Sequence, residues 1–183
     1  MHSDSKPYAD ATIELARIRV KDVHPCQFYA LYQTLDRIKD IYHAFNKLGI
    51  DIFDLEGYLT YRTRNESVLH TLLPVIIEDE YKDNTGTVVS LLVDGLNRMC
   101  LARRIHRRKI LAVRIKHVNR VYPLPAFPNE HGWSDVRQME VLPDPQDKRR
   151  WRFPIGEAYN YYRDFNSAFG NVGQPREKKP EKE

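Results

Sequence analysis

The chain has 183 residues, of which 42% are hydrophobic and 30% are charged, and this composition is typical of a globular protein with one domain. No apolar run reaches the roughly 20 residues of a membrane-spanning helix, the N-terminal residues lack the apolar core of a signal peptide, and two cysteines are too few for a disulfide framework or a zinc site. We therefore expect a cytoplasmic protein with no membrane partner.

The net charge of +4 is unevenly distributed along the chain. Residues 1–94 carry 10 Lys/Arg and 15 Asp/Glu, residues 95–129 carry 9 Lys/Arg and no acid, and residues 130–183 carry 10 of each. The basic stretch without acids predicts a surface that attracts anions. A solvated helix face would give the same count, so both interpretations stay open.

The N-terminal part of the chain predicts a strand and then a long helix. Residues 12–20 alternate apolar and polar positions, as a half-buried strand does. Residues 28–48 place apolar side chains at steps of three or four, which predicts a helix that stops at Gly49. Residues 50–67 are less regular, and we interpret them as a short helix followed by a loop.

The middle of the chain predicts strands around one short helix. A strand is expected around Pro74–Ile77, a hairpin turn in residues 81–88, and a fully buried strand in the apolar run 88–94. A short helix at 97–106 and a strand at 110–118 follow. The expected fold class is therefore α/β (α+β), with a small mixed sheet flanked by helices.

The domain organisation follows from where this pattern begins and ends. We expect a flexible N-terminal arm at residues 1–11, the main domain at 12–121, and an irregular C-terminal extension at 122–173 that packs on the domain. The extension is rich in proline and aromatic residues, and a helix is predicted at 156–170. Residues 174–183 are charged and contain proline, which is typical of a disordered tail.

An acid, a glycine and an arginine lie at the junction of the buried strand and the short helix. The first turn of a helix has unpaired N–H groups and the positive end of the helix dipole, so phosphate oxygens can bind there. Gly95 allows a close approach of the backbone, and Arg98 can add its planar guanidinium. The alternative is that Asp94 only caps the helix and Arg98 only forms an ion pair.

The segment VVSLLVDGLNRMCLARRIHRRKILAVRI resembles the central motif of the ParB/sulfiredoxin-like superfamily. In that motif a strand ends in a glycine, an arginine follows three residues later, and a small residue lies deeper in the helix. Gly95, Arg98 and Ala102 hold these places. The order of the predicted elements over residues 12–118 also resembles that fold, and the D-G-x-x-R form is most similar to its kinase-like branch.

The resemblance implies that the turn binds nucleotide phosphates. The superfamily includes partition proteins that bind and hydrolyse CTP, sulfiredoxins that use ATP, and free-serine kinases. A nucleoside triphosphate or diphosphate (CTP, ATP or ADP) is then the implied ligand, with Mg²⁺ shielding its charge. The phosphate-binding residues would be Gly95, Leu96, Asn97 and Arg98, and Asp94 would be the catalytic residue that orients Mg²⁺ or the acceptor. The activity would be NTP hydrolysis or phosphoryl transfer.

Two departures from the family pattern argue against two named reactions. Sulfiredoxins have a catalytic cysteine directly after the glycine, where this chain has Leu96, and Cys100 is interpreted as helix packing. The kinase branch has a glutamate near the position of Gln27, whose amide cannot act as a general base. Glu14 or His24 would have to replace it.

A non-catalytic alternative rests on the basic segment 103–109. On a helix, its arginines would cover about half of the surface and could contact the phosphates of a nucleic acid or a nucleotide. The chain would then be a DNA-binding or regulatory interaction module. The aromatic and polar segments 131–136 and 159–166 either form a wall over the phosphate site or dock the C-terminal segment on the core. The four arginines of the segment are Arg103, Arg104, Arg107 and Arg108.

Overall fold

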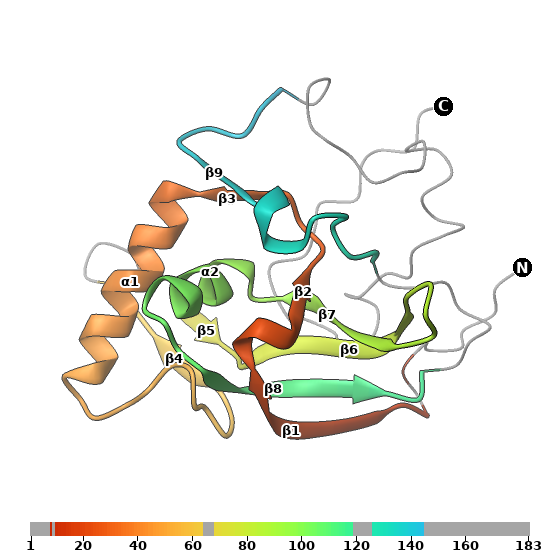
Figure 1. The fold of residues 1–183 in the computed structure, drawn as a ribbon. Helices are drawn as coiled ribbons and strands as arrows, with labels where there is room; N and C mark the ends of the chain where they lie inside the picture. Colours follow the sequence, from red (N-terminus) through yellow and green to blue (C-terminus); the bar gives the residue numbers. More distant parts are fainter. Residues whose placement is uncertain (1–7, 9, 64–67, 119–125, 145–183) are drawn as a thin grey trace, which may run out of the picture.

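The computed structural model describes residue 8 and residues 10–63, 68–118 and 126–144. Two α-helices, two short 3₁₀ helices and nine strands lie in these ranges (Figure 1). The helices are α1 (Tyr32–Asn46), α2 (Leu96–Arg104), η1 (Val20–Asp22) and η2 (Gly132–Asp135). The strands are β1 (Thr12–Arg19), β2 (Val23–Pro25), β3 (Tyr29–Leu31), β4 (Leu59–Tyr61), β5 (His70–Leu72), β6 (Val75–Lys82), β7 (Val88–Asp94), β8 (Lys109–Lys116) and β9 (Arg137–Met139).

Five of the strands form one mixed sheet in the order β1-β8-β6-β7-β2. The β1–β8 and β6–β7 pairs are antiparallel, whereas β8–β6 and β7–β2 are parallel. Two further pairs, β3 with β9 and β4 with β5, form separate small ribbons. The predicted fold class, a small mixed sheet flanked by helices, is confirmed.

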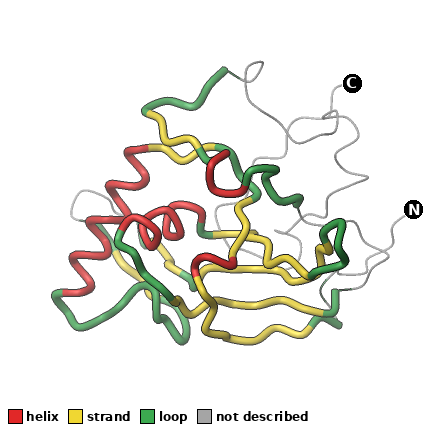
Figure 2. The backbone as a smooth tube through the Cα atoms, in the orientation of Figure 1, coloured by secondary structure: helices red, strands yellow, loops and turns green. Residues whose placement is uncertain are grey.

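Both α-helices pack on the same side of the sheet (Figure 2). The largest core joins buried side chains of α1 and α2 to those of the central strands, among them Ile77, Leu92 and Ile110. The opposite face has a smaller cluster that includes Ile76 and Ile115 and is covered by Tyr8, whose hydroxyl donates a hydrogen bond to the fully buried Glu78. None of the helices in the described ranges is long and apolar enough to cross a bilayer.

Several local predictions are confirmed. The strand predicted at 12–20 is β1, the buried strand predicted at 88–94 is β7, and the strand predicted at 110–118 is β8. The predicted hairpin turn joins β6 to β7, and Asp83 accepts hydrogen bonds from both Thr85 and Thr87 there. The predicted helix stop is also present, because Gly49 has a φ of 74° and follows the last turn of α1.

The predicted helix start at Phe28 is wrong. Residues 29–31 are instead the strand β3, which pairs in parallel with β9. The Phe28 carbonyl accepts a hydrogen bond from the Arg137 amide at 2.7 Å. The apolar spacing of Phe28 and Leu31 fits a helix equally well, so a pairing with a segment more than a hundred residues away decides the conformation.

Two other boundaries also differ from the predictions. The short helix predicted within residues 50–67 is absent from the described part of that segment, where Asp51 instead accepts a hydrogen bond from the Phe53 amide and stabilises a turn. The helix predicted at 97–106 ends at Arg104, because His106 adopts a φ of 55° and turns the chain toward β8. The helix predicted at 156–170 and the tail at 174–183 lie outside the described residues.

Candidate functional site

The turn between β7 and α2 has a geometry that requires glycine. Gly95 has a φ of 101°, in the left-handed region, and it occupies the N-cap of α2. A Cβ atom at this position would lie 3.0 Å from Arg98 Nη2 and 3.0 Å from Val75 Cγ2. The N-cap glycine has no side chain that could cap the helix, so it leaves the first-turn amides of α2 without a side-chain acceptor of its own. Leu96, predicted to bind phosphate, buries its side chain in the core, and only its amide remains available for a ligand.

Arg98 lies under this turn and is almost fully buried. Its side chain is 7% exposed, and Nη2 donates a hydrogen bond to Asp94 Oδ2 at 3.0 Å. Burial lowers the pKa of Arg98, while the charges of Asp94 and Tyr61 act in the opposite direction. An arginine stays protonated in proteins, so a full positive charge lies below the N-terminal end of α2.

Two polar atoms next to the turn lack a hydrogen-bond partner. Arg98 Nη1 and Asn97 Oδ1 are both buried, and neither has a partner among the described residues. A buried polar group without a partner costs about 1–3 kcal/mol, and more when it is charged. An anion that reaches Arg98 Nη1 would remove this cost for the guanidinium.

Among the described residues of the turn, Asp94 is the only one with a carboxylate. Its side chain is 49% exposed, and the ion pair with Arg98 occupies Oδ2. No group of three or more His, Cys, Asp and Glu that could hold a metal lies within the described ranges. This donor set does not form a magnesium site made by the protein alone, because Mg²⁺ prefers several oxygen ligands.

The structure adds three side chains that the sequence analysis did not assign to the site. Tyr61, on β4, lies near enough to Arg98 that its phenolate form would raise the pKa of the guanidinium. Its ring stacks on His70 with 5.3 Å between the centroids, and His70 Nε2 lies 3.0 Å from Arg37 Nη2. No local pattern distinguished these residues, because they come from α1 and from the two strands of an irregular segment.

The four candidate arginines do not share one helix face. Arg103 and Arg104 form the last turn of α2, whereas Arg107 and Arg108 follow the helix in the turn before β8. The Arg107 guanidinium forms an ion pair with Asp51 and lies over the Phe53 ring. The predicted basic helix at 103–109 is therefore wrong as a helix, and the charges are presented by a turn.

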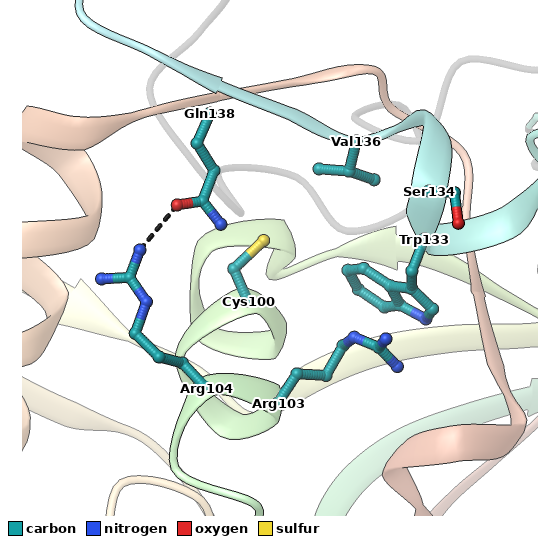
Figure 3. A pocket seen from close by; sticks show the side chains of 7 residues that line it. All are labelled: Cys100, Arg103, Arg104, Trp133, Ser134, Val136 and Gln138. Carbon is teal, nitrogen blue, oxygen red and sulfur yellow. Dashed lines mark hydrogen bonds between the residues drawn. The ribbon is translucent and has the colours of Figure 1, made fainter.

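A hollow of about 410 Å³ separates α2 from the segment that contains η2 and β9 (Figure 3). Arg103 lies 4.7 Å from the centre of the Trp133 ring, and Arg104 Nη2 donates a hydrogen bond to Gln138 Oε1 at 2.6 Å. Trp133 Nε1 donates to the Val23 carbonyl, so this segment is held on the core while it forms one side of the hollow. The structure thus docks residues 131–136 on the core, and the hollow that they line includes none of residues 94–98. Residues 159–166 lie outside the described residues.

The two residues considered as replacement bases lie away from the turn. Glu14 is on β1, at the far edge of the sheet from β7, and its carboxylate pairs with Lys116 Nζ at 2.5 Å. This contact lowers the pKa of Glu14. His24, on β2, lies opposite Leu91 in the middle of β7, three residues before Asp94. The structure brings neither of them to Arg98.

The mixed sheet and the glycine–arginine turn before α2 define a ParB-like domain. The family model of the ParB CE domain matches residues 1–137, and the chain belongs to that family. The match runs from the N-terminal residues to the first residue of β9. No curated protein and no solved structure matches the chain. The relation to the kinase-like branch stays a prediction.

Proposed function

We propose that the turn formed by Asp94, Gly95, Leu96, Asn97 and Arg98 binds the phosphates of a nucleoside di- or triphosphate. The observation that carries this proposal is the buried Arg98 guanidinium, whose Nη1 has no partner in the described part of the chain. A phosphate oxygen there would accept hydrogen bonds from Nη1 and from the uncapped amides of α2. The helix dipole favours the same position for negative charge.

The phosphate of the ligand would replace Asp94 as the hydrogen-bond partner of Arg98. Its side chain is half exposed and regains water when the ion pair opens, so the exchange has a low cost. A phosphate group carries more negative charge than a carboxylate and offers more acceptor oxygens. Mg²⁺ would arrive with the triphosphate, which supplies the oxygen ligands that the protein lacks.

We further propose that the bound nucleotide is hydrolysed or transfers a phosphoryl group, and this reaction would depend on Asp94. A freed carboxylate next to the bound phosphates could orient a water molecule or an acceptor hydroxyl. Release of inorganic phosphate by the wild type, and its loss in Asp94→Asn, would support a reaction at this turn. Nucleotide binding without phosphate release would limit the function to binding.

Thermal unfolding with CTP, ATP, ADP and GTP, each with Mg²⁺, tests the proposal. At about 100 times the Kd, a ligand stabilises the native state by about 2.7 kcal/mol, so we expect at least one nucleotide to raise the Tm of the wild type by several degrees. Arg98→Met, which keeps much of the side-chain volume, should abolish this rise. Lys39→Ala, an exposed substitution on α1, is the matched control and should leave it unchanged. If no nucleotide stabilises the wild type, the proposal is wrong.

A further inference from the structure

The hollow between α2 and the segment of η2 and β9 is not used by the proposed nucleotide site. Its volume of about 410 Å³ falls within the range of small-molecule pockets, about 300–1,000 Å³, and none of residues 94–98 lines it. One side of the hollow is a face of α2, and the other side is formed by η2 and β9 (Figure 3). The hollow is therefore a separate candidate site for a small ligand.

Positive charge gathers on the α2 side of the hollow. Cys100, Arg103 and Arg104 are spaced by three and four residues, so they share one face of the helix. Burial raises the pKa of the Cys100 thiol to about 11, and the charges of the two arginines act in the opposite direction, so both guanidiniums lie near the sulfur. The thiol is neutral at pH 7, and the described residues that line the hollow include no acid.

Both arginines are oriented by their neighbours and keep their charge. Arg103 lies 4.7 Å from the centre of the Trp133 ring, and this contact does not neutralise the guanidinium. Arg104 donates to Gln138 Oε1, and a guanidinium has further N–H groups for a ligand. Neither arginine forms an ion pair with any described residue. Two fixed cations therefore remain available for an anion.

The opposite wall of the hollow is mainly apolar. Trp133 presents its ring, Val136 presents its side chain, and the Cys100 sulfur points from α2 toward Val136 (Figure 3). The Trp133 ring is fixed in place, because its Nε1 donates a hydrogen bond to the Val23 carbonyl at 2.8 Å. A ligand with an apolar body and a negatively charged head matches these two walls.

The available donors indicate a carboxylate head and not a phosphate. A phosphate group carries more charge and more acceptor oxygens, and unpaired backbone N–H groups at a helix N-terminus suit it best. This hollow lies beside the last turns of α2, where the helix dipole disfavours an anion. Two guanidiniums that each have another contact match the two oxygens and the single charge of a carboxylate.

We propose that this hollow binds a small organic carboxylate, with its charged head at the two guanidiniums and its apolar body against Trp133 and Val136. The site is separate from the Asp94–Arg98 turn. Binding should therefore need neither Mg²⁺ nor the Arg98 side chain.

Titrations of the full chain with benzoate, cyclohexanecarboxylate and indole-3-acetate, followed by ligand-observed NMR, test the proposal. The three acids share the carboxylate and differ in the apolar body. We expect at least one of them to bind with a Kd of about 1 mM or lower, as a good ligand of this size does. The amide of the same acid has the same shape and no charge, and it should bind at least about tenfold more weakly.

Two double variants locate the carboxylate. Arg103→Gln/Arg104→Gln should weaken binding at least about tenfold, because it removes both charged donors. Arg108→Gln/Lys109→Gln is the matched control and should change the Kd less than about threefold. It removes the same charge at exposed residues that line a different groove, between η1 and the turn after α2. All four substituted residues are exposed, and circular dichroism checks that each variant is folded.

The outcomes separate this proposal from a general charge effect and from the nucleotide site. Absence of binding of all three acids, equal affinity for an acid and its amide, or equal losses in the two double variants would overturn it. Arg98→Met, which should abolish nucleotide binding, should leave the Kd of the carboxylate unchanged. Loss of carboxylate binding in that variant would place the ligand at the Asp94–Arg98 turn and would also overturn the proposal.

Discussion

At the N-terminal end of α2 one guanidinium is buried and has one carboxylate partner, whereas at the C-terminal end several cations are exposed around a groove. The charge of Arg98 lies where water is largely excluded, so its interactions are strong and weakly screened by salt. The charges around the C-terminal groove are solvated, so each contributes little by itself.

The helix dipole separates the two ends further. Arg103 and Arg104 lie in the last turn, where cations stabilise a helix. Arg98 is in the first turn, where a positive charge is unfavourable, and it is also buried with an unpartnered Nη1. A residue that opposes local stability in two ways fits the proposed phosphate site, whereas the C-terminal arginines are also explained by helix stability.

The largest effect on stability is expected from Gly95→Ala. The left-handed φ of 101° and the 3.0 Å contacts to Arg98 and Val75 together should lower the free energy of unfolding by about 3 kcal/mol, from backbone strain and overpacking. Gly86→Ala is the matched control, because Gly86 has a φ of 80° with nothing within 4 Å, and it should cost about 1 kcal/mol. Urea unfolding of both variants measures the difference, and equal decreases in stability would show that the tight packing under Gly95 has no energetic role.

Arg98→Met tests whether the buried charge is held at the expense of stability. The substitution removes a buried charge and its desolvation cost, and Asp94, which is half exposed, stays solvated without its partner. The free energy of unfolding should therefore stay unchanged or rise by up to about 2 kcal/mol. Nucleotide binding should be abolished at the same time. A decrease of more than about 1 kcal/mol in the free energy of unfolding, measured with urea, would show that Arg98 stabilises the fold. The two ends of α2 would then not differ in the way described above.

Asp94→Asn tests whether the carboxylate competes with the nucleotide for Arg98. Removal of the competing charge frees Arg98, and because the ion pair is half exposed the gain is at most about 1 kcal/mol, or about fivefold in nucleotide affinity. Isothermal titration calorimetry with and without Mg²⁺ measures it. Weaker binding that appears only with Mg²⁺ would instead identify Asp94 as a metal ligand.

The smallest effect is expected at Cys100, which lies between the two ends of α2. Burial raises the pKa of this thiol to about 11, although Arg103 and Arg104 act in the opposite direction. The pKa of Cys26 is raised to about 12, also by burial. Both thiols should stay protonated at pH 8, so alkylation by iodoacetamide should be slow in the folded chain and fast in urea. Rapid alkylation of the folded chain at pH 7 would show that the hollow between α2 and the segment of η2 and β9 opens.

The strands and the turn before α2 were predictable because their signals are local. The alternation in residues 12–20, the apolar run 88–94 and Gly95 each indicate a conformation from neighbouring residues alone. The start of α1 was not predictable, since Phe28 is held extended by the Arg137 amide. The same holds for Tyr61 and His70, which reach the site through ring stacking that no spacing encodes.

By itself, the sequence determined the order of the main strands and helices, the glycine–arginine turn and the basic stretch after Gly95. Only the tertiary structure decided that Arg98 is buried with Nη1 unpaired among the described residues, that Arg107 and Arg108 leave the helix, and that Lys21 lines the same groove as they do. The physical reason is that backbone preference and charge are properties of neighbouring residues, whereas burial and the convergence of charges depend on contacts between distant parts of the chain.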